Sequence, residues 1–227
     1  MSAPAPDIHR DLQDLRSRTL RLGGRVEDMV VRATRAMVQR DGRLAEETMT
    51  LEPEVDRMAA AIDTDCVRLM DRWRPGGAEL RALTFTLKTL PHLARIGALA
   101  SAVCDKARSL AGDGVTDPAV DLSDMGALVS EMLGNAIDAF VNQDAAAAAA
   151  VVERDDALDE QYDRVKLARM RDAQSAEDTA ELLRAIHTLM VAKHLERMGD
   201  HATEIAEKVL DLYDARPDAP TGRYASG

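Results

Sequence analysis

Residues 29–41 read MVVRATRAMVQRD, and residues 132–144, 103 positions later, read MLGNAIDAFVNQD. The two stretches align without a gap. At an offset of 102, residues 92–98 (HLARIGA) match residues 194–200 (HLERMGD). Matches at both ends of a unit of about 100 residues, at nearly constant spacing, indicate a duplicated structural unit.

Composition favours helices over sheets in both copies. Aromatic residues make up 3% of the chain and hydrophobic residues 46%, and Ala, Leu, Met, Glu, Asp and Arg are abundant. Small and unbranched side chains suit helix packing, whereas sheets favour β-branched and aromatic residues. The 227 residues are enough to bury a substantial core.

Helical periodicity runs along nearly the whole chain and is interrupted by clusters of Gly, Pro and Asp. We therefore predict an all-α fold of two tandem three-helix bundles, residues 8–110 and 121–213, with flexible termini at 1–7 and 214–227. Pro91 predicts a kink or local break, because proline cannot donate to the preceding helical turn. The expected helices span residues 8–40, 43–72, 77–110, 121–142, 145–171 and 177–213.

Charge and cysteine content exclude several functional classes. The net charge of −11 disfavours binding to nucleic acid and to anionic lipid, but it suits divalent cations or basic surfaces of partner proteins. Cys66 and Cys104 lack CxxC spacing and are expected in the core or at its boundary. No apolar run approaches 18 residues and no signal-peptide pattern is present, so we expect a cytoplasmic protein.

Pairs of acidic residues four positions apart place two carboxylates on one helical face. If the last two helices pack side by side, two such pairs converge in the second unit. Oxygen ligands of this kind suit Mg²⁺, Ca²⁺ or Mn²⁺ and can hold iron, while a nitrogen from His201 would favour a transition metal. A solvent-exposed acidic face explains the pairs without any ligand, and it is the commoner explanation for acidic pairs in an acidic protein. The expected ligands are Asp155, Asp159, Glu196 and Asp200, with Asp156, Glu204 or Glu207 as possible additions.

The first unit differs from the second at these positions. Glu52 and Asp56 correspond to the first acidic pair, but Ala94 and Ala98 replace the second. We therefore predict that a metal site in the second unit is impaired or absent in the first.

Other candidate sites are weaker. His187, His194 and His201 recur every seven residues, which predicts either a ligand row or histidines at the helix boundary. Gly23 and Gly24 indicate a bend, a hinge or a close-packing point. The chain has no GxSxG, P-loop, GxGxxG or HExxH motif, so common hydrolase, NTPase and dinucleotide-binding functions have no support.

Residues 195–207 (LERMGDHATEIAE) resemble the LERIGDHAxNIAE signature of the PhoU family, and the resemblance covers about residues 8–213. It implies two three-helix bundles with E/DxxxD motifs that hold metal clusters at the surface. Carried over by position, the ligands are Asp155, Asp159, Glu196 and Asp200, and the metal is Fe, Mn, Mg or Zn. Ala94 breaks the motif in the first unit.

The same resemblance implies a regulatory adaptor that restrains phosphate uptake and kinase signalling when phosphate is plentiful. Its implied partners are the ATP-binding subunit of the phosphate ABC transporter and a phosphate-sensing histidine kinase, and we expect a homodimer. Two alternatives remain open: a carboxylate-bridged metalloenzyme, and a phosphate-storage or chaperone-like protein with a structural metal. The Glu-x-x-His motif usual for such enzymes is missing, since Leu210 follows Glu207 at that spacing.

Overall fold

The computed structural model describes residues 7–111, 120–142 and 144–214, and within them every element is a helix. The prediction of an all-α fold is confirmed. The predicted flexible termini lie outside the described residues, except that Asp7 caps the first helix and Asp214 ends the last. The helices are α1 (Ile8–Gln39), α2 (Gly42–Met49), α3 (Glu52–Trp73), α4 (Gly77–Leu110), α5 (Val120–Asn142), α6 (Ala145–Ser175) and α7 (Thr179–Asp214).

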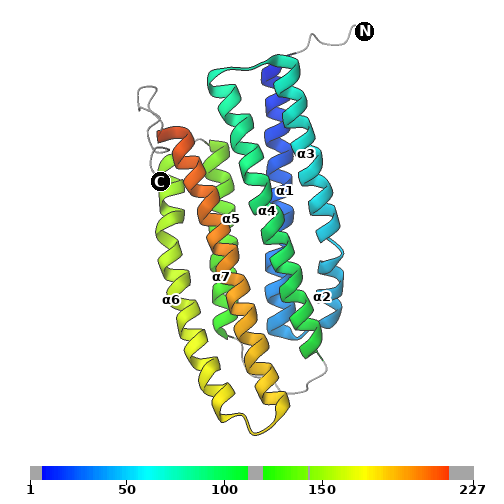
Figure 1. Cartoon of the computed structure of the whole chain (residues 1–227), viewed down its shortest axis with the longest axis vertical. Helices are drawn as coiled ribbons and strands as arrows, with labels where there is room; N and C mark the ends of the chain where they lie inside the picture. Colours follow the sequence, from blue (N-terminus) through cyan, green and yellow to red (C-terminus); the bar gives the residue numbers. More distant parts are fainter. Residues whose placement is uncertain (1–6, 112–119, 143, 215–227) are drawn as a thin grey trace, which may run out of the picture.

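The two repeats form two bundles that lie side by side (Figure 1). Helices α1 to α4 make the first bundle and α5 to α7 the second. Helix α1 packs beside α5, and α4 beside α7, across the boundary between the bundles. The buried apolar side chains of both repeats belong to one continuous cluster, so the repeats share a core.

Equivalent aspartates begin equivalent helices in the two repeats. Asp41 accepts a hydrogen bond from the Leu44 N–H at 2.9 Å, and Asp144 accepts one from the Ala147 N–H at 2.9 Å. A side-chain acceptor at the N-cap satisfies a backbone donor that the helix leaves unpaired. The offset of 103 found in the sequence therefore corresponds to the same local structure.

The first repeat contains one more helix than predicted. The helix expected over residues 43–72 is divided into α2 and α3, and the Leu51 N–H bonds the carbonyl of Thr48 at 3.0 Å in a tight turn. Pro53 lies at the start of α3, where its missing N–H is tolerated but a continuous helix is not favoured. Asp156 occupies the equivalent position in α6, which is continuous. The prediction of six helices is wrong for this reason.

The boundary before the last helix lies two to four residues later than predicted. Helix α6 continues to Ser175, whose hydroxyl bonds the carbonyl of Arg171 at 3.0 Å. Asp178 then accepts a hydrogen bond from the Glu181 N–H at 2.8 Å and caps α7. Helix α4 runs through Pro91 without the local break considered above, and a kink there stays a prediction.

Two reciprocal glycine contacts join α1 to α5. A Cβ on Gly23 would lie 2.3 Å from Ile137 Cδ1, and a Cβ on Gly126 would lie 2.3 Å from Thr34 Cγ2. Gly23 and Gly126 are equivalent positions in the repeat, as are Thr34 and Ile137. The close-packing explanation is confirmed for Gly23, whereas a Cβ on Gly24 would meet nothing within 4 Å.

The apolar positions of the predicted helices supply the core. Leu195, Met198 and Ile205 of α7 and Met132 and Ile137 of α5 are buried. Cys66 and Cys104 are buried free thiols, as predicted, and burial raises the pKa of each to about 12. No described helix is long and apolar enough to span a membrane.

Candidate functional site

Helices α6 and α7 pack closely at a glycine that lies between the acidic pairs of the second repeat. Gly199 lies in α7 between Glu196 and Asp200, and a Cβ on it would come 2.0 Å from a terminal methyl group of Leu158 in α6. Leu158 is fully buried and stands next to Asp159. Because glycine lets the helices approach, both acidic pairs lie in one region, as the sequence predicted.

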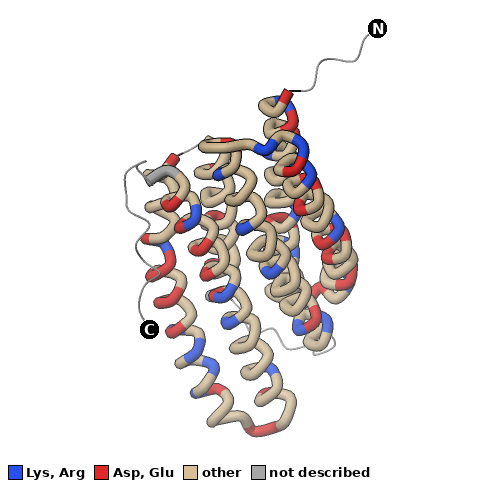
Figure 2. Tube along the Cα trace, turned by 45° about the horizontal axis from the view of Figure 1, so that its top comes forward, with Lys and Arg blue, Asp and Glu red and all other residues tan. Residues whose placement is uncertain are grey.

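The acidic residues continue along α6, where acidic positions follow one another on the tube (Figure 2). Asp155 is half-buried and accepts a hydrogen bond from the hydroxyl of Thr203 in α7 at 3.1 Å. Asp156 and Asp159 are exposed. The site therefore has a solvated side on α6 and a covered side on α7.

Glu196 is the most deeply placed of the four predicted ligands, with 9% of its surface exposed. Glu196 is therefore not part of a fully solvent-exposed helical face. Lys193 contacts its Oε1 at 2.5 Å, and the Lys193 ammonium lies 5.1 Å from the ring centroid of Tyr162. Its Oε2 is buried and has no hydrogen-bond partner among the described residues. A buried carboxylate oxygen without a donor is costly unless a cation or water satisfies it.

Burial, together with the negative charges nearby, raises the pKa of two neighbouring carboxyl groups. Burial, followed by the charges of Glu196 and Asp155, raises the pKa of Asp200 to about 6. Burial also raises the pKa of Asp155, and the charges of Asp159, Asp156 and Glu196 add to the effect. Carboxylates that resist ionisation together are those that a bound cation would stabilise most.

The four carboxylates are neighbours without enclosing a common point. Among the described residues, no three of them bring one oxygen each within 4.8 Å of one another. The donor set nevertheless fits a hard cation or iron, because it is made of carboxylates and includes the partnerless Glu196 Oε2. Asp155, Asp159, Glu196 and Asp200 are the residues that would hold it.

The first repeat conserves the packing of this region without its charges. A Cβ on Gly97 of α4 would meet Val55 Cγ1 of α3 at 3.3 Å, the counterpart of the contact between Gly199 and Leu158. Ala94 and Ala98 flank this glycine. The first repeat therefore carries methyl groups at the positions where the second carries the carboxylates of Glu196 and Asp200.

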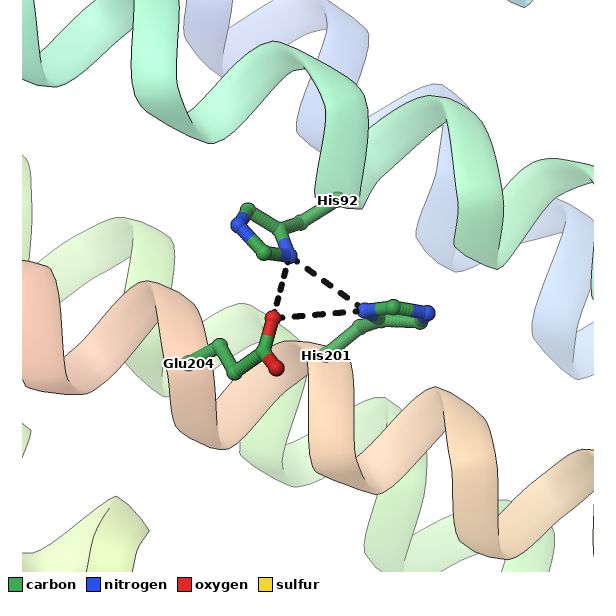
Figure 3. A group of neighbouring side chains, drawn as sticks. All are labelled: His92, His201 and Glu204. Carbon is green, nitrogen blue, oxygen red and sulfur yellow. Dashed lines mark hydrogen bonds and ion pairs between the residues drawn. The ribbon is translucent and has the colours of Figure 1, made fainter.

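A second group of side chains, which the sequence did not single out, lies between the repeats. His92 of α4 meets His201 and Glu204 of α7 (Figure 3). Glu204 and the Nδ1 atom of His201 are therefore directed at α4, whereas both residues were expected as additions to the carboxylate cluster. The signal available in the sequence was His92 itself, which aligns with His194.

The fold and the site define an all-helical protein of two repeated bundles with a carboxylate cluster on the second. The profile of the PhoU domain family matches residues 19–107 and 122–209, one match for each repeat. The chain belongs to the PhoU family.

Named relatives match over most of their length. The chain is 33% identical to the phosphate-specific transport system accessory protein PhoU homolog of Pseudomonas aeruginosa over 206 residues, 90% of this chain and 84% of that protein. It is 28% identical to the phosphate-specific transport system accessory protein PhoU of Escherichia coli K12, over 89% of this chain and 83% of that protein.

Solved structures share the architecture. The crystal structure of PhoU from Pseudomonas aeruginosa superposes with a TM-score of 0.86 at 31% identity, covering 92% of this chain and all of that chain. The phosphate transport system regulatory protein PhoU from Streptococcus pneumoniae has a TM-score of 0.84 at 22% identity, which shows the common fold. The predicted fold of two PhoU-like repeats is therefore confirmed.

Proposed function

We propose that this chain is an accessory protein of phosphate transport that acts by binding other proteins. The observation that carries the proposal is the match of both repeats to one family, together with relatives named as phosphate-specific transport system accessory proteins along most of the chain. In the finer form of the proposal, a cytoplasmic homodimer binds the ATP-binding subunit of the transporter and a phosphate-sensing histidine kinase. It restrains both when phosphate is plentiful and catalyses no reaction itself.

A surface suited to such contacts lies at the free end of the α6–α7 hairpin, which extends past the neighbouring helices in Figure 1. Among the described residues, six of the nine large hydrophobic side chains that are exposed lie in this segment. Concentrated apolar exposure of this kind is typical of interaction surfaces. The six residues, here called the hairpin patch, are Leu167, Met170, Leu182, Leu183, Ile186 and Met190.

Pull-down with the purified ATP-binding subunit tests the proposal. We expect the wild type to bind the subunit and Leu183→Glu/Ile186→Glu to lose at least about tenfold in affinity, because charge replaces apolar contact at the interface. Val67→Glu is the matched control, since Val67 is 56% exposed on α3. Absence of binding to both the subunit and the kinase at high and low phosphate would reject the adaptor function. Equal loss in the control would reject the hairpin patch.

We also propose that the carboxylate cluster of the second repeat binds a divalent cation or iron. The support is the buried Glu196 Oε2 without a donor and the raised pKa of Asp200. A bound cation would neutralise the clustered charge and stabilise the packing of α6 against α7. In the bound state Lys193 would give up its contact with Glu196.

Elemental analysis of the purified chain tests this site after supplementation with iron, manganese, magnesium or zinc. We expect metal in the wild type and a lower metal content in Glu196→Gln/Asp200→Asn, which keeps the side-chain volumes. Glu52→Gln/Asp56→Asn in the first repeat is the control and should retain the wild-type content. Metal content that is nil in the wild type, or that is unchanged by the second-repeat substitutions, contradicts the proposal.

A further inference from the structure

We propose that His92, His201 and Glu204 form a binding site for Zn²⁺, or for a transition metal ion of similar preference, between the two repeats. His92 comes from α4, and His201 and Glu204 come from α7 (Figure 3). One ligand atom from each residue lies within 4.8 Å of the other two, and this is the one group of three such residues among the described parts of the chain. The site differs from the carboxylate cluster in its two histidine ligands and in lying between α4 and α7, whereas the cluster lies between α6 and α7.

The distances suit a small ion. The Nδ1 atoms of His92 and His201 are 3.3 Å apart, and His201 Nδ1 lies 3.6 Å from Glu204 Oε2. Ligands about 2.0 to 2.1 Å from a tetrahedral Zn²⁺ are separated by roughly 3.3 to 3.4 Å. The third pair, His92 Nδ1 and Glu204 Oε2, is at hydrogen-bond distance, 2.7 Å. It must open by roughly 0.6 Å to admit the ion.

The helix geometry supplies two of the ligands in advance. His201 and Glu204 are three residues apart on α7, a spacing that places both side chains on one helical face. Two imidazoles and one carboxylate are a ligand set that proteins use for Zn²⁺ with a fourth position open to water. The Glu204 side chain is 47% exposed, so the ion has a path from solvent and the open position faces it.

The charges around the group bear on whether it can hold a positive ion. Nearby cations oppose the ion: Lys208 acts on His92, and Arg95 and Arg197 act on His201. Glu204 is therefore the ligand whose negative charge offsets the repulsion between these cations and a bound metal ion.

A metal held by both repeats would fix α4 against α7 in addition to the shared apolar core. The predicted effect of the ion is a more stable junction between the bundles.

Titration of the metal-free, full-length chain with Co²⁺ tests the site, because four-coordinate Co²⁺ absorbs visible light far more strongly than the six-coordinate ion of an all-oxygen site. We expect strong absorption at about one equivalent, displaced by Zn²⁺. His92→Ala, His201→Ala and Glu204→Gln should each weaken binding at least about tenfold. His194→Ala removes a half-buried histidine from the same helix and should leave the titration unchanged.

Two further measurements keep the result unambiguous. Glu204→Gln changes a half-exposed side chain, so it remains informative if either alanine variant fails to fold. Glu196→Gln/Asp200→Asn should keep the strong absorption, which separates this site from the carboxylate cluster. Zn²⁺ should raise the Tm of the wild type and of that double variant but not of Glu204→Gln. Weak six-coordinate absorption alone, or equal affinity in the wild type and Glu204→Gln, would overturn the proposal.

Discussion

The two repeats share their packing and differ in their surfaces. Both begin the second helical segment with a capping aspartate, and both place a glycine of the third segment against an apolar side chain of the second. Around that glycine the first repeat carries Ala94 and Ala98, whereas the second carries Glu196 and Asp200. The close packing of the helices is therefore independent of the charges, and the second repeat adds a carboxylate cluster to a packing arrangement that the first repeat forms without it.

The largest effect that separates the repeats is expected from truncating the side chain beneath the carboxylates. Leu158→Ala leaves a cavity where Leu158 fills the space against Gly199, and it should lower the free energy of unfolding by about 2 to 5 kcal/mol. Val55→Ala, the equivalent change in the first repeat, removes less volume and should cost less. Chemical denaturation measures both values. A larger loss for Val55→Ala would contradict equivalent roles for the two contacts.

The junction between the repeats should be nearly as sensitive. A Cβ on Gly126 would lie 2.8 Å from Thr34 Cβ as well as close to its methyl group, so rotation of the side chain alone does not relieve the clash. We expect Gly126→Ala to lower the free energy of unfolding by about 1 to 3 kcal/mol.

Gly24→Ala is the control for this prediction, since a Cβ there meets nothing and alanine favours the helix by up to about 1 kcal/mol. Thermal and urea unfolding should therefore shift in opposite directions for the two variants. A stabilised Gly126→Ala variant would show that the reciprocal glycine contacts are not tight.

A smaller effect concerns pH. The pKa of Asp200 is about 6 in the folded protein and about 3.9 in an unfolded chain, so between these values the folded state binds more protons. Stability of the metal-free protein should then fall as pH rises through this window. Asp200→Asn should remove much of the decrease, and Asp56→Asn in the first repeat should not. Tm measured from pH 4 to 7 in the presence of a chelator decides between these outcomes.

The smallest effect comes from making the repeats alike. Ala94→Glu/Ala98→Asp places acidic side chains opposite Glu52 and Asp56, and repulsion should lower stability by a few tenths of a kcal/mol without metal. Divalent cations should reverse the loss and raise the metal content above that of the wild type. Elemental analysis and Tm with and without cation provide the test. If cations change neither quantity, the second-repeat site needs more than its four carboxylates.

The burial of Glu196 shows where reasoning from a single helix ends. On α7 alone, Glu196 falls outside the apolar stripe, which predicts a solvated side chain. The structure covers it with α6, because Gly199 lets the helices approach until Leu158 fills the gap. Such burial depends on a neighbour about 40 residues away in the chain, which helical periodicity does not report.

Sequence by itself determined the duplication, the helical class, the core-facing stripes and the positions of the acidic pairs. These features follow from local periodicity and from residue types at fixed spacing, and both can be read directly from the amino-acid sequence. Tertiary structure alone decided that His92 faces His201 and Glu204, 109 and 112 positions later, and that the repeats share one core. The physical reason is that docking of helices depends on the fit of side chains from distant segments, which only the folded chain brings into contact.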